Sequence, residues 1–437
     1  MVSARIFITC LAALGATHAL ALEYPVGSPQ TPAGMAIAAD KLQPVETASD
    51  GSAGPAVNLA TALDSVKLNA SITAALQKFN NADNLTERDV SLTNYRGDLT
   101  ASLPWGSIGD NDGQFFSHFR FGQGRGAHMH HAYTSNLNSL TFEKAEGPDE
   151  AFAFLAQVWY QLKLPLNVGD GKESARDHLY FTFGKIDPFV FFDQNTAADD
   201  ESSNFLNNIF VHNPLLDSGG DIGADNNGFM PGMVVKYANS HHKGGEWALS
   251  AGAFSAGNRA HLGGANHASF LIAQAETRLR LNDRPGTWRA YLWSNSRVEN
   301  YDGQKRRNTG WGLSLDQKVT DSLMLFGRYG HHKAGKVRFD RAITLGGELL
   351  GTAWRRGDDA LGLAFGNLRT SDTYRQDAPN LCGYSAHRNE QQVELYYRYK
   401  LNSAIELTPS AQWLRNPGGD HSASSTRIIG LRAKISF

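Results

Sequence analysis

Polar, charged and aromatic side chains recur at every second position along several stretches of the sequence. This spacing places them on one face of a β-strand, because side chains alternate between the two faces of a strand. Charged groups of both signs can exchange hydrogen bonds with a polar solute, and aromatic rings can cover its apolar surface. We expect these residues to line a polar passage, or to form charge ladders that only keep its wall polar. They are Arg120, Glu276, Arg278, Arg280, Arg289, Tyr291, Trp293, Arg328, Glu394, Arg398, Arg432 and Lys434.

Other residue groups that resemble reactive sites lack the surroundings that such sites need. Histidines cluster at 128–131, 241–242 and 331–332, in predicted loops or turns, whereas metal ligands must converge with defined spacing. Residues 252–257 resemble a nucleophile elbow and residues 122–126 a nucleotide loop, but neither lies between a strand and a helix pattern. We therefore predict no enzyme activity, no cofactor and no metal site.

The elements that must hold the candidate residues are predicted strands with one apolar and one polar face. The clearest is 428–437, in which every odd-numbered residue from Ile429 to Phe437 is apolar, while Arg432 and Lys434 lie on the opposite face. The same alternation is present in residues 66–77, 271–281, 393–400 and 405–413. These patterns indicate an all-β chain.

The length and number of the predicted strands favour a membrane barrel over a soluble sheet. They run for about 9–11 residues, the length of a tilted membrane-spanning strand. We count about sixteen of them from residue 66, and an even number suits a closed bacterial barrel without an exposed edge. A secreted β-sandwich is the alternative, but it would need shorter strands and usually disulfides. We predict a transmembrane antiparallel β-barrel of about 16 strands over residues 61–437.

Connections of two lengths alternate along the predicted barrel. Short ones at 282–286, 319–321 and 400–403 are expected to be periplasmic turns, and long ones at 123–150, 188–229 and 370–389 to be outer loops. A long loop in a compact barrel usually has a function.

We expect the loop 188–229 to fold into the lumen and narrow it, with a short helix over 199–210. Asp187, Asp193, Asn195 and Asn208 would then lie near a constriction, or would only hold the loop to the inner wall. Both roles stay open at the level of sequence.

The first 60 residues predict an exported chain. Residues 1–21 resemble a secretory signal peptide, with a positive charge at Arg5, a short apolar run and an Ala-x-Ala end at Ala21. Residues 22–60 are rich in Ala, Pro, Ser and Gly and predict a flexible N-terminal lead-in. A net charge of −2 excludes a strongly basic nucleic-acid-binding protein. No apolar run approaches the ~18 residues of a membrane-spanning helix.

Four stretches resemble the carbohydrate-selective porins of the OprB family. They are GKIDPFVFFDQNTAADDESSNFLNNIF at 184–210, GELLGTAWRRGDDALGLAFG at 347–366, WLRNPGGD at 413–420 and GLRAKISF at 430–437. The resemblance covers roughly residues 60–437. It implies a sixteen-stranded outer-membrane barrel that passes small sugars by passive diffusion. The terminal Phe437, shared by most outer-membrane barrels, implies a signal for the barrel-assembly machinery.

The resemblance further implies the outer membrane of a Gram-negative bacterium as location, with small carbohydrates and outer-membrane lipid as partners. It favours a monomer and leaves a trimer possible. Three other functions remain open: a general small-solute pore, a polysaccharide-export barrel and, less so, a barrel enzyme. A lipase-like enzyme would need a Ser-His-acid set on the lipid-facing wall, where the predicted residues are apolar.

Overall fold

The computed structural model describes residues 66–81, 91–108, 111–124, 137–140, 150–166, 175–216, 224, 227–241, 245–257 and 260–437. The predicted signal peptide and lead-in lie outside these residues, as do the histidines of 128–131 and His242. In this part of the chain, no helix combines the length and the apolar character needed to cross a membrane.

Sixteen antiparallel strands make up most of the described chain. They are β1 (Lys67–Asn80), β2 (Ser91–Ile108), β3 (Asn111–Gln123), β4 (Ala151–Leu166), β5 (Asp177–Ile186), β6 (Met230–Asn239), β7 (Trp247–Ser255), β8 (Ala268–Leu281), β9 (Arg284–Glu299), β10 (Lys305–Lys318), β11 (Leu323–Ala334), β12 (Phe339–Gly351), β13 (Arg356–Thr370), β14 (Glu390–Lys400), β15 (Ile405–Arg415) and β16 (Thr426–Ser436).

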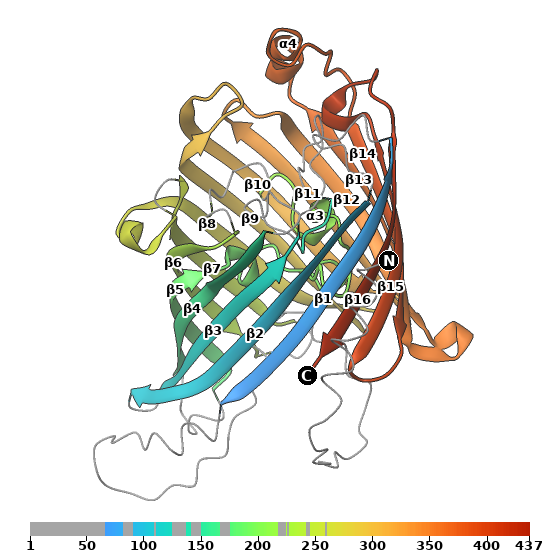
Figure 1. The fold of residues 1–437 in the computed structure, drawn as a ribbon. Coiled ribbons are helices and arrows are strands. Elements are labelled where there is room, and N and C mark those ends of the chain that lie inside the picture. The colour runs from blue at the N-terminus through green and yellow to red at the C-terminus, as the bar shows by residue number, and fades with distance from the viewer. Residues whose placement is uncertain are drawn as a thin grey trace, which may run out of the picture. The chain divides into compact units, whose positions relative to one another are not determined.

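Each strand pairs with its neighbours in the sequence, and β1 also pairs with β16, which closes the barrel (Figure 1). At this seam Ser71 lies opposite Ser436 and Asn80 opposite Arg427. Closure gives every strand two partners, so no row of backbone N–H and C=O groups is left at an open edge. The predicted antiparallel barrel of about sixteen strands is confirmed.

The alternation predicted from the sequence separates an apolar outer face from a polar inner face. On the outer face Leu76, Leu363 and Ile429 have exposed fractions of 49%, 54% and 71%. The residues that alternate with these along each strand point inward. Gln77 of β1 and Arg432 of β16 are almost completely buried there. An apolar outer surface is stable in lipid but would be costly in water.

Most strands are longer than the predicted 9–11 residues. β7 has 9 residues, but β4 and β9 have 16 each and β2 has 18. The prediction was too short because it followed only apolar alternation, whereas the ladder continues into polar residues at the strand ends. Lys305 of β10, for example, still pairs with Glu299 of β9.

The connections predicted to be short, at 282–286, 319–321 and 400–403, lie at the end of the barrel opposite to the long connections 188–229 and 370–389, as predicted. The connection at 335–338, at the end with the long loops, is also short. The turn from β8 to β9 consists of Asn282 and Asp283, both with positive φ (51° and 62°), the backbone of a tight hairpin turn. At the other end, the β13–β14 connection contains α4 (Asp372–Leu381), a helix not predicted from the sequence and visible above the barrel in Figure 1. Ser371 caps α4 by accepting a hydrogen bond from Tyr374 N at 3.1 Å.

Candidate functional site: the barrel interior

Residues 187–216, between β5 and β6, contain little regular structure. Asp187 caps η3 (Pro188–Val190) by accepting a hydrogen bond from Phe189 N at 2.9 Å. Asn207 caps α3 (Asn208–Val211) in the same way, by accepting from Ile209 N at 3.3 Å. The predicted helix over 199–210 is therefore wrong except for its last three residues.

A first anchor joins this segment to β9 and β11. Asp193 is completely buried and accepts hydrogen bonds from Tyr291 Oη at 2.9 Å and from Asn213 N at 2.6 Å. Its Oδ2 lies 3.2 Å from Nε of Arg328, and Nη1 of Arg328 donates to Phe210 O at 2.8 Å. One inward-facing arginine thus binds the segment at two places, Asp193 and Phe210.

A second anchor explains why the predicted helix is absent. The Glu394 carboxylate of β14 accepts from the backbone N–H groups of Leu206 and Asn207, each at 2.8 Å. These N–H groups therefore bond to the wall instead of to a preceding helical turn. Close by, Arg398 donates to Ser203 O at 3.1 Å and pairs with Glu348 at 3.0 Å.

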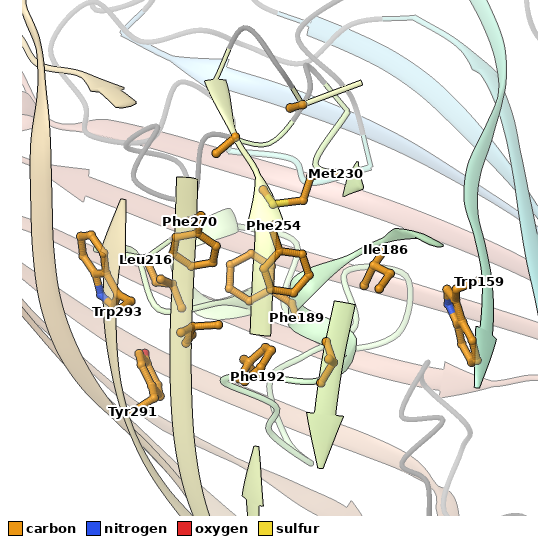
Figure 2. Close-up of a cluster of buried hydrophobic side chains, with 14 of the residues drawn as sticks. Trp159, Ile186, Phe189, Phe192, Leu216, Met230, Phe254, Phe270, Tyr291 and Trp293 are labelled. Carbon is orange, nitrogen blue, oxygen red and sulfur yellow. The ribbon is translucent and has the colours of Figure 1, made fainter. Parts of the chain in front are cut away.

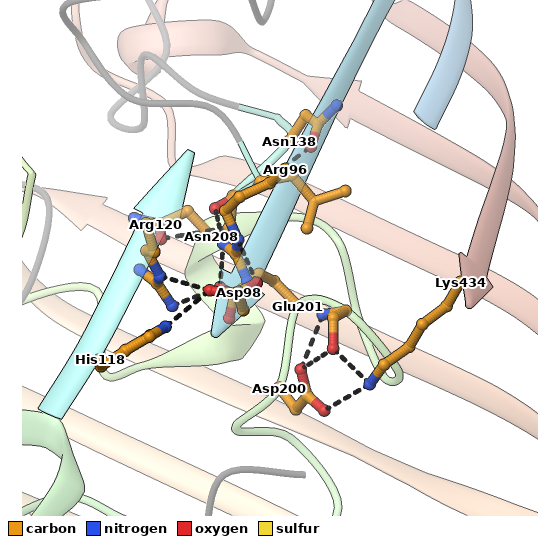
Figure 3. A network of polar contacts seen from close by, with 12 residues as sticks. Arg96, Asp98, His118, Arg120, Asn138, Asp200, Glu201, Asn208 and Lys434 are labelled. Carbon is orange, nitrogen blue, oxygen red and sulfur yellow. Dashed lines mark hydrogen bonds and ion pairs between the residues drawn. The ribbon is translucent and has the colours of Figure 1, made fainter. Parts of the chain in front are cut away.

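A third anchor lies on β2 and β3 (Figure 3). Asp98 binds Arg96, His118 and Arg120 at 2.8, 2.8 and 2.7 Å. Arg96 Nη1 also lies 2.5 Å from the Glu201 carboxylate of the segment, and Arg120 Nη2 lies 3.7 Å from it. Two wall arginines therefore share two carboxylates, one from the wall and one from the loop.

β16 extends this third anchor on its other side. Arg432 donates to Glu201 O at 2.7 Å, and Lys434 donates to Ser202 Oγ and Ser203 Oγ, both at 2.7 Å. Asp200 lies 3.8 Å from Lys434. Burial opposes ionisation of Asp200, but Lys434 and the hydrogen bonds from Ser202 outweigh it and lower the Asp200 pKa to about 2.

Apolar side chains of the segment pack against inward-facing aromatic residues in two clusters. In the first, shown in Figure 2, Phe189, Phe192 and Leu216 pack with wall residues that include Phe254 and Trp293. In the second, Phe205, Ile209 and Phe210 pack with wall residues that are Phe326, Phe339, Ala342, Ala364, Leu368 and Tyr396. Burying such side chains contributes on the order of 1.5–3 kcal/mol each, so the segment is held by packing as well as by ion pairs.

Titratable side chains that keep some exposed surface mark where the interior remains accessible. Asp199, Glu201, His212, Lys236, Glu276, Glu348 and Lys434 each have between 12% and 23% of the side chain exposed. These residues include both acids and bases. Some belong to the segment 187–216 and the others to the barrel wall. Burial raises the pKa of Asp199 to about 6, against the opposing effects of His212 and Arg328.

A charge ladder runs along the wall across β6, β8, β9 and β10. Lys236 lies 3.5 Å from Glu276, and Glu276 pairs with Arg289 at 2.8 Å. Arg289 also pairs with Asp316 at 2.8 Å. Thr196 of the segment donates to the same Asp316 at 3.0 Å. The charge ladder on the wall therefore also contacts the segment.

The structure brings some predicted residues together and separates others. Asp193, Tyr291 and Arg328 form one anchor, and Glu276 and Arg289 form part of the ladder. Asn195 donates to Leu315 O at 3.1 Å, and Asn208 accepts from Ser139 Oγ at 3.3 Å. Leu315 belongs to β10, so the contact of Asn195 holds the loop to the wall. Ser139 belongs to the β3–β4 connection, so the contact of Asn208 joins two connections.

Four further predicted residues lie away from the anchors. Trp293 is buried against His332 at 5.3 Å between ring centroids. Arg278 and Arg280 lie near the short-turn end of β8, where Arg280 is exposed and donates to Asp283 O at 3.2 Å. Phe437 follows β16, is 66% exposed, and donates its backbone N–H to Ala70 O at 2.9 Å.

Several residues of the barrel interior were not predicted from the sequence. They are Arg96, Asp98, His118, Asp199, Glu201, Lys236, Asp316 and Glu348. Asp316 and Glu348 lie at inward-facing positions of β10 and β12. They could have been predicted by following the alternation of side chains to the ends of these strands. No local pattern indicates Asp199 or Glu201, which lie in irregular backbone.

The described histidines do not converge. His331 faces outward against Trp311, with ring centroids 5.8 Å apart, whereas its neighbour His332 faces inward. His241 lies 2.9 Å from Asp177 at the short-turn end. Among the residues placed by the structure, no group of three or more His, Cys, Asp or Glu side chains could hold a metal ion.

The family model for the carbohydrate-selective porins of the OprB family matches residues 27–437. The chain belongs to this family. Its barrel is similar to a solved structure of Pseudomonas putida OprB, with a TM-score of 0.67 and 16% sequence identity, over 86% of this chain and 96% of that one. At this identity the likeness shows the fold.

Two curated relatives match a shorter part of this OprB-family chain. Porin AaxA of Chlamydia pneumoniae is 25% identical over 152 residues, which cover 35% of this chain and 33% of the relative. Porin AaxA of Chlamydia felis is 23% identical over 151 residues, which cover 35% and 32%. The matches thus span about a third of each relative. Family and barrel fold together imply a porin of the outer membrane of a Gram-negative bacterium.

Proposed function

We propose that this chain is a passive outer-membrane pore through which small carbohydrates diffuse into the periplasm. The observation that carries the proposal is the segment 187–216, which is held against the inner wall by three sets of polar anchors and two apolar clusters. A rigid segment of this kind narrows the interior to a passage with charged groups of both signs. Such a passage suits neutral solutes that exchange water for hydrogen bonds.

The predicted site residues take two roles in this proposal. Asp187, Asp193, Asn195, Asn208, Tyr291, Trp293, Arg328 and Arg398 position the segment. Glu276 and Arg278 face the solute, together with Arg280 at the periplasmic entrance. Arg120 and Arg289 are almost completely buried and hold the neighbouring carboxylates in place. The Glu276–Arg289 pair offers acceptors and donors side by side, which a sugar hydroxyl can use in either direction.

The proposal requires no covalent chemistry, so the chain would not be an enzyme. Export would use the predicted signal peptide at 1–21, and Phe437 would serve the barrel-assembly machinery. Support for an outward apolar wall comes from residues such as Leu271 and Leu292, which are 53% and 65% exposed. We expect a monomer to be sufficient for transport, because the segment that narrows the passage is supplied by the same chain.

Liposome swelling tests the proposal. Refolded protein is incorporated into liposomes, and swelling rates are compared for mono-, di- and trisaccharides and for amino acids of similar size. We expect sugars to enter faster than amino acids of equal size. Equal rates for solutes of one size would indicate a general sieve. No swelling from a folded, heat-modifiable barrel would contradict a diffusion pore and favour an export or enzymatic barrel.

A further inference from the structure

Basic side chains form a band on the outer face of the barrel at the end that carries the long loops. We define this basic band by six residues that are all exposed. They are Lys78 of β1, Arg307 of β10, Lys333 of β11, Arg341 of β12, Arg415 of β15 and Arg427 of β16. The band therefore follows one side of the barrel, from β10 through the β16–β1 seam (Figure 1).

The band lies directly beside the apolar belt. Arg341 is two residues from Ile343, and Lys78 is two residues from Leu76, so each cation shares the outer face with its apolar neighbour. Arg427 is likewise followed two residues later by Ile429, which is 71% exposed. Cations at this height lie where the hydrocarbon of a membrane gives way to its headgroups.

The band has few counter-charges of its own. None of its six members forms an ion pair within the part of the chain that the structure describes. The carboxylates of Asp340 and Asp372, from β12 and α4, both bind Arg369, at 2.6 and 2.7 Å. These acids pair directly with Arg369, which is not a member of the band, although Asp372 also interacts electrostatically with Arg341. The six cations of the band therefore outnumber the acids near them.

The other side of the barrel differs. In strands β2 to β8 the described Arg and Lys side chains are ion-paired in the interior, as for Arg96, Arg120 and Lys236, or lie near the short turns. Lys185 alone lies near the loop end there, and its Nζ donates to Leu155 O at 3.1 Å. Within the strands that the structure describes, exposed cations near the loop end are therefore concentrated on the side of the band, which favours a partner on that side.

We propose that the basic band binds the phosphorylated headgroup of an anionic lipid in the leaflet at the loop end, with the acyl chains against the apolar belt below it. Cations beside a bilayer surface attract anionic lipids by about 1 kcal/mol each. Arg341 is the centre of the site, because Lys333 of the adjacent strand β11 lies on the same outer face, two residues beyond His331, the register partner of Arg341. Its guanidinium can bind a phosphate through two parallel hydrogen bonds.

Native mass spectrometry of the refolded protein in detergent tests this proposal. The probes are bisphosphorylated lipid A, the same lipid after removal of its phosphates, and inorganic pyrophosphate. The band variant is K333Q/R341Q/R427Q. The control, K67Q/K318Q/K400Q, removes the same number of positive charges at the short-turn end, from positions with the inward parity of their strands. Heat-modifiability on gels and circular dichroism verify that both variants are folded.

We expect the band variant to bind the bisphosphorylated lipid at least about tenfold more weakly than the parent, with the control unchanged. The dephosphorylated lipid should bind weakly to all three proteins. Equal binding of the phosphorylated lipid to parent and band variant would overturn the proposal. Binding of pyrophosphate to the parent as tightly as the phosphorylated lipid would also overturn it, because this result would indicate a site for free phosphate. A change of oligomeric state in lipid-free detergent, with lipid binding unchanged, would assign the band to contact with a second copy.

Discussion

Arg328 and Asp193 form an ion pair from which solvent is fully excluded. Nε of Arg328 lies 3.2 Å from Oδ2 of Asp193, and neither side chain has exposed surface. The pair joins the barrel wall to the segment 187–216. Breaking a buried pair on one side leaves the remaining charge desolvated and without its partner, which costs more than the pair itself contributes.

Replacing Arg328 with Met is expected to lower the free energy of unfolding by about 3–5 kcal/mol, because Asp193 would stay buried without its cation. The measurement is guanidinium unfolding in detergent, followed by tryptophan fluorescence. The double variant D193N/R328M should lose less than the sum of the two single variants. Additive losses would show that the two side chains act independently.

More of the fold than of the candidate site could be predicted from the sequence. The alternation that defines a strand is a local pattern: inward Arg432, for example, lies between the apolar residues Leu431 and Ala433. The approximate number of strands and the direction of their side chains could therefore be predicted from the sequence. The contacts of Glu201 with Arg96 and Arg432 join residues that are far apart in the sequence. No local pattern encodes them, and the extended backbone at Leu206 depends on Glu394, which lies 188 residues later.

Replacing Glu394 with Gln is expected to loosen the segment around Leu206 and Asn207. A carboxylate can accept from both backbone N–H groups with its two oxygens, whereas an amide offers one oxygen and faces the other N–H with a donor. We expect a loss of about 1–3 kcal/mol in local stability. Hydrogen exchange at the amides of Leu206 and Asn207 should become faster. E299Q, at an exposed strand end, is the control and should leave both amides protected. Unchanged exchange in E394Q would contradict the anchoring role.

Asp199 should give the pore a dependence on pH. Its pKa of about 6 lies above the ordinary value because of burial, against the effects of His212 and Arg328. The folded state therefore holds this proton more tightly than the unfolded state, so Asp199 favours folding as the pH falls from above 6 towards about 4. Over the same range the passage loses one negative charge.

We expect the reversal potential in a salt gradient to shift towards anion selectivity between pH 7.5 and pH 5 in the parent. D199N should lack this shift. D200N should keep it, because the pKa of Asp200 is lowered to about 2 and this residue stays ionised throughout. An equal shift in the parent and D199N would assign the titration to another group.

Phe205 tests the apolar attachment of the segment. It is completely buried between Phe326 and Tyr396, with ring centroids 5.6 and 5.0 Å away. F205A should cost about 3–5 kcal/mol through lost burial and the cavity left behind, and should increase current noise in single-channel recordings. L363A, on the lipid-facing side of β13, should leave the noise at the level of the parent. Identical noise in F205A and L363A would contradict a packed segment.

The central claim is that the segment 187–216 narrows the passage and gives it preference for sugars. The most direct measurement compares liposome swelling by the parent and by a variant that lacks residues 196–208, after heat-modifiability has verified that the variant is folded. We predict faster swelling for every solute and loss of the difference between a disaccharide and an amino acid of similar size. Parental rates and parental selectivity in the folded variant would contradict the account.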